Sequence, residues 1–100
     1  RAKEMPFLAL LKKEVFGIKD LAEMDQDQRD LLVQTTKDIL EQLKDSVQEV
    51  GFWQNSGSQK KLKSFIAFNL LTAFHGNKTI ANKKSELSQK LMELAFHLYR

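Results

Sequence analysis

The chain contains no cysteine, which excludes a disulfide framework, a thiolate metal site and a cysteine nucleophile. This absence fits the reducing cytoplasm, where we expect the protein to reside. No apolar run approaches the roughly 20 residues that a membrane-spanning helix needs, and the charged and apolar regions of a signal peptide are missing. We therefore expect no membrane partner.

Residues that break helices are also scarce, because the 100 residues include one proline and four glycines. Such a composition favours an all-α fold. A chain of this length forms about one domain, residues 1–100, and buries roughly 65% of its unfolded surface. We expect a compact bundle of four or five helices with one long central helix. The first residue is Arg1 rather than methionine, which indicates a piece of a longer protein.

Apolar spacing and capping signals predict the first two helices. Pro6 suits a first helical turn and Gly17 a helix end. The apolar residues on one face between them are Phe7, Leu8, Leu11 and Val15. Asp25 and Gln28 have the spacing of a capping box, so the long helix should run from there to about Val50. Its apolar seam should comprise Leu32, Thr36, Ile39, Leu43, Val47 and Val50. The acids expected on its opposite face are Asp30, Asp38, Glu41, Asp45 and Glu49.

Two further helices are predicted in the second half. After a polar turn at residues 55–58, a helix should run from about Ser58 to Phe74. Its buried face should comprise Leu62, Phe65, Ile66, Leu70 and Ala73. Gly76 and Asn77 should end it, and a last helix should run from about Asn82 to Tyr99. The last helix has one apolar stripe of Leu87, Leu91, Leu94 and Leu98, and a second of Met92, Phe96 and Tyr99.

Acidic residues are nearly absent from the second half. Residues 1–50 hold 11 acids and 8 bases, a formal charge of −3, whereas residues 51–100 hold 2 acids and 8 bases, a formal charge of +6. One interpretation is ordinary solvation with attraction between the halves. The other is a basic face for phosphate or for an acidic partner.

Lysines at the starts of the last two helices form the candidate nucleic-acid site: Lys60, Lys61, Lys63, Lys78, Lys83 and Lys84. Ammonium groups neutralise phosphates and could hold a nucleic-acid backbone. No arginine, the residue favoured for bidentate recognition of bases, accompanies them, so any binding should be non-specific. The alternative is that these lysines only form a solvated helix face.

Neither a metal site nor a catalytic site is recognisable. Asp25 and Asp27 suggest a calcium loop, but its fifth, sixth and twelfth positions hold Arg29, Asp30 and Thr36 instead of an oxygen ligand, a glycine and a glutamate. Helix capping accounts for these acids. His75 and His97 lie far apart, and His75 should cap carbonyls or face solvent. Because no phosphate-binding loop or nucleophile motif is present either, we expect no catalytic residue, metal or cofactor in this chain.

The only tryptophan, Trp53, follows Gly51 and Phe52 at the exit of the long helix. It is either a core residue that plugs the junction with the next helix, or a hot spot for a partner's pocket. We favour the core, because Gly51 and Phe52 already indicate a tight turn. Apolar residues beyond the needs of one small core are candidate partner contacts: Phe68, Leu71, Met92, Phe96 and Tyr99.

The motif at this exit is Val50-Gly51-Phe52-Trp53-x-Asn55. A polar turn follows it, then Leu62 and Ile66 in one helix and Leu87-x-x-x-Leu91-x-x-Leu94-Ala95 in the last. Over residues 39–98 this pattern resembles the C-terminal helical region of the restriction (R) subunit of type I restriction-modification enzymes. That family often has proline at the position of Ser56 and acids at those of Lys60 and Lys61, so this chain is more basic there.

The resemblance implies a parent subunit with a nuclease domain, two helicase-like translocase domains that use ATP and Mg²⁺, and this helical end. The parent would be an ATP-dependent type I site-specific deoxyribonuclease. This chain, itself not an enzyme, would dock the motor subunit onto the methyltransferase core of modification and specificity subunits, with additional non-specific contact to DNA. The alternatives are a free-standing helical nucleic-acid-binding module and an enzyme fragment with a hidden active site.

Overall fold

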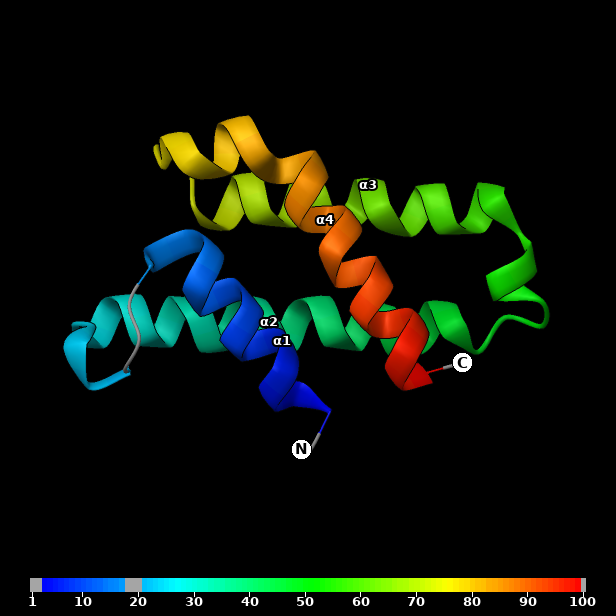
Figure 1. Cartoon of the computed structure of the whole chain (residues 1–100), viewed down its shortest axis with the longest axis horizontal. Coiled ribbons are helices and arrows are strands. Elements are labelled where there is room, and N and C mark those ends of the chain that lie inside the picture. Colours follow the sequence, from blue (N-terminus) through cyan, green and yellow to red (C-terminus); the bar gives the residue numbers. More distant parts are fainter. Residues whose placement is uncertain (1–2, 18–20, 100) are drawn as a thin grey trace.

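The computed structural model describes residues 3–17 and 21–99, and this part of the chain contains four α-helices and no strand (Figure 1). They are α1 (Glu4–Leu11), α2 (Gln26–Val47), α3 (Ser56–Ala73) and α4 (Lys78–Tyr99). The all-α bundle predicted from the sequence is therefore confirmed. The central helix is not unique in length, because α2 and α4 each contain 22 residues.

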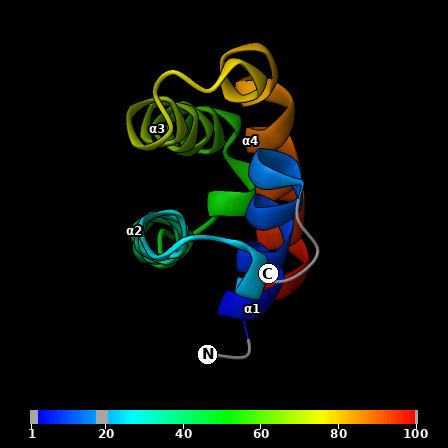
Figure 2. The ribbon, with the colours of Figure 1, turned by 90° about the vertical axis from the view of Figure 1, so that its left-hand side faces the viewer.

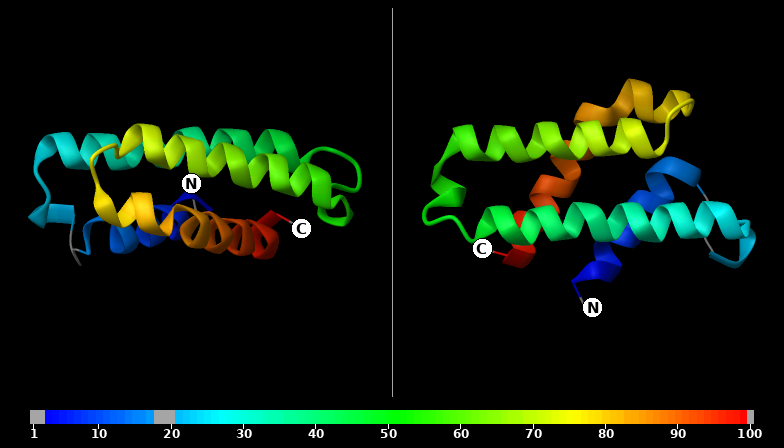
Figure 3. Two further views of the ribbon diagram at one scale, coloured as in Figure 1. Left: turned by 90° about the horizontal axis from the view of Figure 1, so that it is seen from above. Right: turned by 180° about the vertical axis from the view of Figure 1, so that it is seen from behind.

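The helices form two layers (Figure 2). α2 and α3 run antiparallel in one layer, and α1 and α4 cross them in the other, as the views from above and behind also show (Figure 3). α1 packs mainly on α2, and α4 packs mainly on α3. The radius of gyration is 13.3 Å, close to the roughly 13 Å of a compact chain of this size. The shape is flat, with extents of 41 × 28 × 16 Å, because it is only two helices deep.

α1 continues directly into a π-helical turn, Lys12–Phe16, which ends at Gly17 as predicted. Gly17 adopts a left-handed conformation with φ +65°, and its N–H donates to the carbonyls of Lys12 and Lys13. The predicted apolar face is buried throughout: Phe7, Leu8, Leu11 and Val15. Beyond Gly17, Leu21–Glu23 form a 3₁₀ turn, and residues 18–20 lie outside the described part.

α2 begins at the predicted capping box. The Asp25 carboxylate accepts from the Gln28 N–H at 2.8 Å, and the Asp25 N–H donates to the Gln28 side chain at 3.2 Å. The predicted seam is buried at Leu32, Thr36, Ile39 and Leu43 and half-buried at Val47, and all five predicted acids on the opposite face are exposed. Its last member was predicted wrongly: Val50 is 98% exposed, because α2 ends at Val47 and Gly51 then reverses the chain with φ +73°.

Asparagine caps move the starts of both later helices upstream of their predicted positions. The Asn55 side chain accepts from the Ser58 N–H at 3.0 Å, so α3 starts at Ser56. The Asn77 side chain accepts from the N–H groups of Thr79 and Ile80, at 2.9 and 3.2 Å. Asn77 therefore caps the start of α4 as well as following the end of α3. The added first turn of α4 brings Ile80 into the core.

The buried faces of these helices differ from those predicted. On α3, Leu62, Ile66 and Leu70 are buried, but Ala73 is half-buried and Phe65 is 37% exposed. On α4, the buried residues are Ile80, Leu87, Ser88, Leu91, Met92 and Ala95. This face lies between the two predicted stripes, so Leu94, Leu98, Phe96 and Tyr99 flank it half-buried.

Candidate interaction groove

The turn between α2 and α3 forms the base of the candidate site. Gly51 provides the left-handed residue that reverses the chain, and Phe52 is buried in the core with 3% of its surface exposed. The Phe52 carbonyl accepts from the Gln59 side chain at 3.0 Å, and Asn55 caps α3. The motif that carries the family resemblance thus has a structural explanation at each of these positions.

Trp53 connects this turn to α4. Its ring makes edge-to-face contacts with Phe52, at 4.8 Å between centroids, and with Phe96, at 5.2 Å. The side chain is half-buried and packs against the core, and its contact with Phe96 joins the turn between α2 and α3 to α4. The indole N–H is buried and has no hydrogen-bond acceptor among the described residues. The exposure of Trp53 therefore lies between that of a core residue and that of an exposed interface hot spot, the two roles considered from the sequence.

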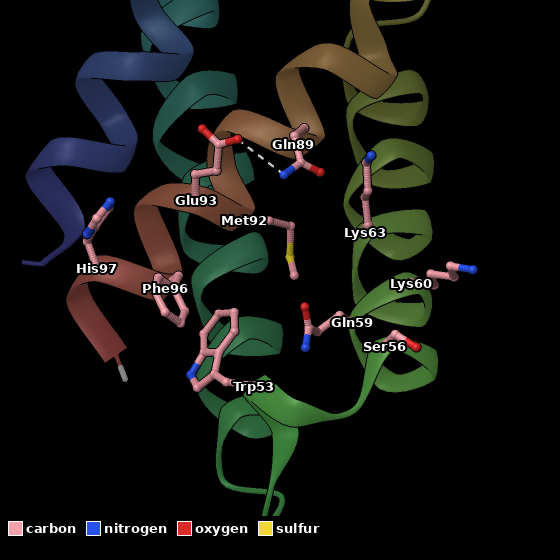
Figure 4. Close-up of a pocket in the computed structure, with 10 residues that line it drawn as sticks. All are labelled: Trp53, Ser56, Gln59, Lys60, Lys63, Gln89, Met92, Glu93, Phe96 and His97. Atoms are coloured by element: carbon pink, nitrogen blue, oxygen red, sulfur yellow. Dashed lines mark hydrogen bonds between the residues drawn. The ribbon is translucent and has the colours of Figure 1, made fainter.

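A groove of about 520 Å³ opens between the first half of α3 and the second half of α4, beside this turn (Figure 4). Its apolar floor consists of Trp53, Met92 and Phe96. One wall comes from α3, with Ser56, Gln59, Lys60 and Lys63, and the other from α4, with Gln89, Glu93 and His97. Gln59 and Met92 point toward one another across the groove, whereas Lys60 extends outward from its rim (Figure 4). The Gln89 amide donates to the Glu93 carboxylate at 3.2 Å, which holds Glu93 along its own helix.

The candidate lysines lie in three separate places. Lys60 and Lys63 are at the groove. Lys61 lines a smaller hollow of about 250 Å³ between α2 and α3, beside Asp45 and Glu49. Lys78, Lys83 and Lys84 lie in the first two turns of α4, at the opposite end of α3 (Figure 1). The structure therefore does not bring the six lysines together into one basic surface.

The apolar residues proposed as partner contacts also divide. Phe68 is 68% exposed, so it is available at the surface. Leu71, Phe96 and Tyr99 are half-buried and pack against the core or against Trp53. Met92 is 7% exposed and belongs to the core, so its prediction as a spare surface residue is wrong, although its side chain lines the floor of the groove. Four exposed apolar residues were missed from the sequence, where nothing distinguishes them from core positions: Met5, Leu31, Val50 and Phe65.

Two side chains of α4, Lys90 in its middle and Tyr99 at its end, have raised pKa values. The Glu14 carboxylate lies 3.0 Å from the Lys90 ammonium, and this hydrogen bond raises the pKa of Lys90. Burial raises the pKa of the Tyr99 phenol. The Tyr99 hydroxyl has no hydrogen-bond partner within the described residues, and its ring lies 6.5 Å from Phe7 and 4.6 Å below the Lys3 ammonium.

The structure shows the positions of the two histidines and of Asp25, the first acid of the calcium-loop pattern that the sequence analysis rejected. His75 faces solvent after α3, and His97 is exposed at the groove rim. Asp25 caps α2, and the described residues contain no group of three or more His, Cys, Asp or Glu side chains arranged to hold a metal ion. Nor does the described part contain a helix with the length and apolar character needed to cross a membrane.

Comparison with known proteins identified no relative: no protein-family model, curated protein sequence or solved structure matches this chain. The resemblance of residues 39–98 to type I restriction subunits stays a prediction.

Proposed function

We propose that this chain is an assembly domain, which docks the motor and endonuclease subunit of a type I restriction enzyme onto its methyltransferase core. The modification and specificity subunits of that core would be its partners. The resemblance of residues 39–98 to the restriction subunit is the reason for choosing a type I restriction enzyme as the complex. The physical observation that supports a docking role is the groove between α3 and α4, which combines an aromatic floor with a polar, cationic rim.

Such a combination is typical of protein interfaces. Aromatic side chains and methionine are enriched at their centres, and polar side chains surround them. The centre of this groove has aromatic and methionine side chains: Trp53, Phe96 and Met92. Its rim along α3 is polar and contains Lys60 and Lys63. Phe68 adds an exposed aromatic residue on the same helix.

Contact with DNA is the second part of the proposed role. Residues 51–99 contain lysines but no arginine, so contact through phosphates is expected rather than recognition of bases. Because the lysines occupy three places, each could contribute a few phosphate contacts to DNA held by the larger complex.

A free-standing nucleic-acid-binding module is the alternative, and the +6 formal charge of residues 51–100 favours it. The separation of the lysines favours the assembly role instead, since tight binding to one duplex requires cations along a common surface.

The test is a pull-down of the methyltransferase core by the parent subunit, with and without this 100-residue segment. We expect the truncated subunit to lose its association with the core. Unchanged affinity of the truncated subunit would refute the assembly role. Duplex binding by the 100-residue chain alone, with the association of the truncated subunit intact, would support the alternative.

A further inference from the structure

We propose that the groove between α3 and α4 binds an acidic peptide segment of a partner protein through one bulky apolar anchor residue. This inference rests on the proposed assembly role and specifies the chemistry of the partner at that site. Three properties of the groove support it: its apolar floor, the charge of its walls and the position of its one acid.

The floor provides a place for an apolar anchor. Trp53, Met92 and Phe96 together present aromatic and thioether surface at the bottom of a 520 Å³ groove, within the usual range of roughly 300–1,000 Å³ for ligand pockets. Met side chains adapt their shape to a bound group, and aromatic rings provide large contact areas. A leucine, phenylalanine or methionine of a partner would remove this surface from water.

The walls select the charge of the peptide. α3 contains three lysines and no acid over its whole length, and two of these lysines, Lys60 and Lys63, line the groove. Lys63 runs along the α3 wall, so its ammonium group can meet a carboxylate of a segment lying over the groove, whereas Lys60 extends outward from the rim and can meet one beyond the edge of the groove (Figure 4). Complementary charges of this kind increase association rates and exclude partners of the wrong sign.

Glu93 on the opposite wall fixes the orientation of the segment. It is the one carboxylate among the groove residues, and it accepts from Gln89 on the same helix. The acids of the partner should therefore lie along α3. Next to Glu93 and His97 we expect neutral or basic residues of the partner instead.

The rings favour a peptide over a nucleic-acid strand. Strands without sequence preference bind by stacking bases on open aromatic faces beside a positive track. Here Trp53 is held edge-to-face between Phe52 and Phe96, and no arginine lines the groove. The geometry suits insertion of a side chain better than stacking of a base.

The experiment is selection of a random 12-residue peptide library on the 100-residue chain, followed by titration of synthetic peptides that lack tryptophan. Trp53 is the only tryptophan and lies on the groove floor, so its fluorescence reports binding at this site directly. We expect the enriched peptides to carry several acids around one large apolar residue. Replacing that residue by alanine should abolish the fluorescence change.

Matched charge reversals localise the site. Lys60→Glu with Lys63→Glu should weaken peptide binding about tenfold or more, equivalent to about 1.4 kcal/mol. Lys78→Glu with Lys83→Glu changes the net charge equally at the far end of α3 and should leave the affinity unchanged. Circular dichroism of both variants should match the parent chain, because all four side chains lie at the surface or at the groove rim.

Several results would overturn the inference. They are failure to enrich any peptide, enrichment of basic peptides, equal effects of the two charge reversals, or tighter binding of a single-stranded oligonucleotide at Trp53. The proposed assembly role fails separately, if the pull-down of the methyltransferase core does not depend on this segment. Assembly that needs the segment but tolerates Lys60→Glu and Lys63→Glu would refute the groove alone.

Discussion

At the scale of single residues, two buried polar atoms stand out among the described residues: the indole N–H of Trp53 and the hydroxyl of Tyr99, neither of which has a hydrogen-bond partner there. A buried polar group without a partner costs roughly 1–3 kcal/mol. Trp53 lies on the floor of the groove beside α4, and Tyr99 is the last residue of α4. Substitutions that remove only the polar atom and substitutions that remove the ring should therefore have different effects on the free energy of unfolding.

Replacing Tyr99 with phenylalanine should raise the free energy of unfolding by about 1 kcal/mol at neutral pH, because the ring remains and the unpartnered hydroxyl is removed. Urea denaturation at pH 7 measures this. The ring contact with Phe7 should persist, so Tyr99→Leu, which removes it, should destabilise the protein and serves as the control. A destabilised Tyr99→Phe variant would show that the hydroxyl has a stabilising partner.

The same residue predicts a pH dependence. Burial raises the pKa of Tyr99 in the folded state above the roughly 10 of the unfolded state, so the unfolded chain ionises first as the pH rises. Stability should be unaffected below about pH 10 and decline above it. The raised pKa of Lys90, caused by Glu14, acts in the same direction, because its stabilisation is present below the unfolded pKa and is lost at higher pH. The decline should be smaller in Tyr99→Phe; an identical decline would assign it to Lys90 or other groups.

Trp53→Ala should lower the free energy of unfolding by about 3 kcal/mol, the low end for truncation of a large aromatic residue, because Trp53 is only half-buried. The loss comes from its contacts with Phe52 and Phe96. Phe68→Ala is the control, since Phe68 is exposed and should change stability by less than about 0.5 kcal/mol. Chemical denaturation followed by circular dichroism measures both. Equal stability of the two variants would show that Trp53 contributes nothing to the core.

At the scale of helices, the sequence predicted features that depend on neighbouring residues better than features that depend on packing between helices. The capping box at Asp25 and the end at Gly17 are interactions between near neighbours, and both were predicted correctly. Asn77 was predicted to end α3, because an asparagine after a glycine is typical of helix ends, yet its side chain caps α4. The buried face of α4 could not be predicted from spacing alone, because packing on α3 and α1 selects a face between two apolar stripes and buries Met92.

The position of Ser56 allows a test of the turn between α2 and α3. Ser56 is the first residue of α3, and Asn55 before it has extended angles, φ −112° and ψ 99°, close to the region that a following proline favours. Ser56→Pro should therefore raise the free energy of unfolding by about 0.5 kcal/mol, by restricting the unfolded chain. Thermal melting measures it.

Ser58→Pro is the matched control, because the Ser58 N–H donates to the Asn55 cap and its loss should lower the melting temperature. If Ser56→Pro is as destabilising as Ser58→Pro, Ser56 is not the first residue of α3 in solution.

At the scale of the whole molecule, charge is segregated between helices. The exposed face of α2 is acidic, whereas α3 contains only basic charged residues. The sequence predicted this charge asymmetry but not the separation of the lysines into different places. Lys61 lies beside Asp45 and Glu49, whereas Lys60 lies at the groove. Which lysine lies where depends on the faces of α3 that pack on α2 and on α4, and sequence spacing does not give these.

This distribution predicts the behaviour toward DNA. Lys60→Glu, Lys61→Glu and Lys63→Glu together should weaken binding to a duplex and flatten the dependence of affinity on salt, because fewer counterions are released. Fluorescence anisotropy of a labelled duplex over a range of salt concentrations measures the slope. A second variant carries Lys78→Glu, Lys83→Glu and Lys84→Glu at the other end of α3 and should flatten the slope as well, because this group also offers phosphate contacts. An unchanged slope in the first variant would exclude these three lysines from DNA contact.

We propose that this domain attaches a motor subunit to a methyltransferase core through the groove between α3 and α4. The most direct measurement is the dissociation constant between the purified parent subunit and that core, compared for the unchanged subunit, for Lys60→Glu with Lys63→Glu, and for Lys78→Glu with Lys83→Glu. We predict weakening of about tenfold in the first variant and no change in the second. Equal dissociation constants for all three proteins would contradict the claim.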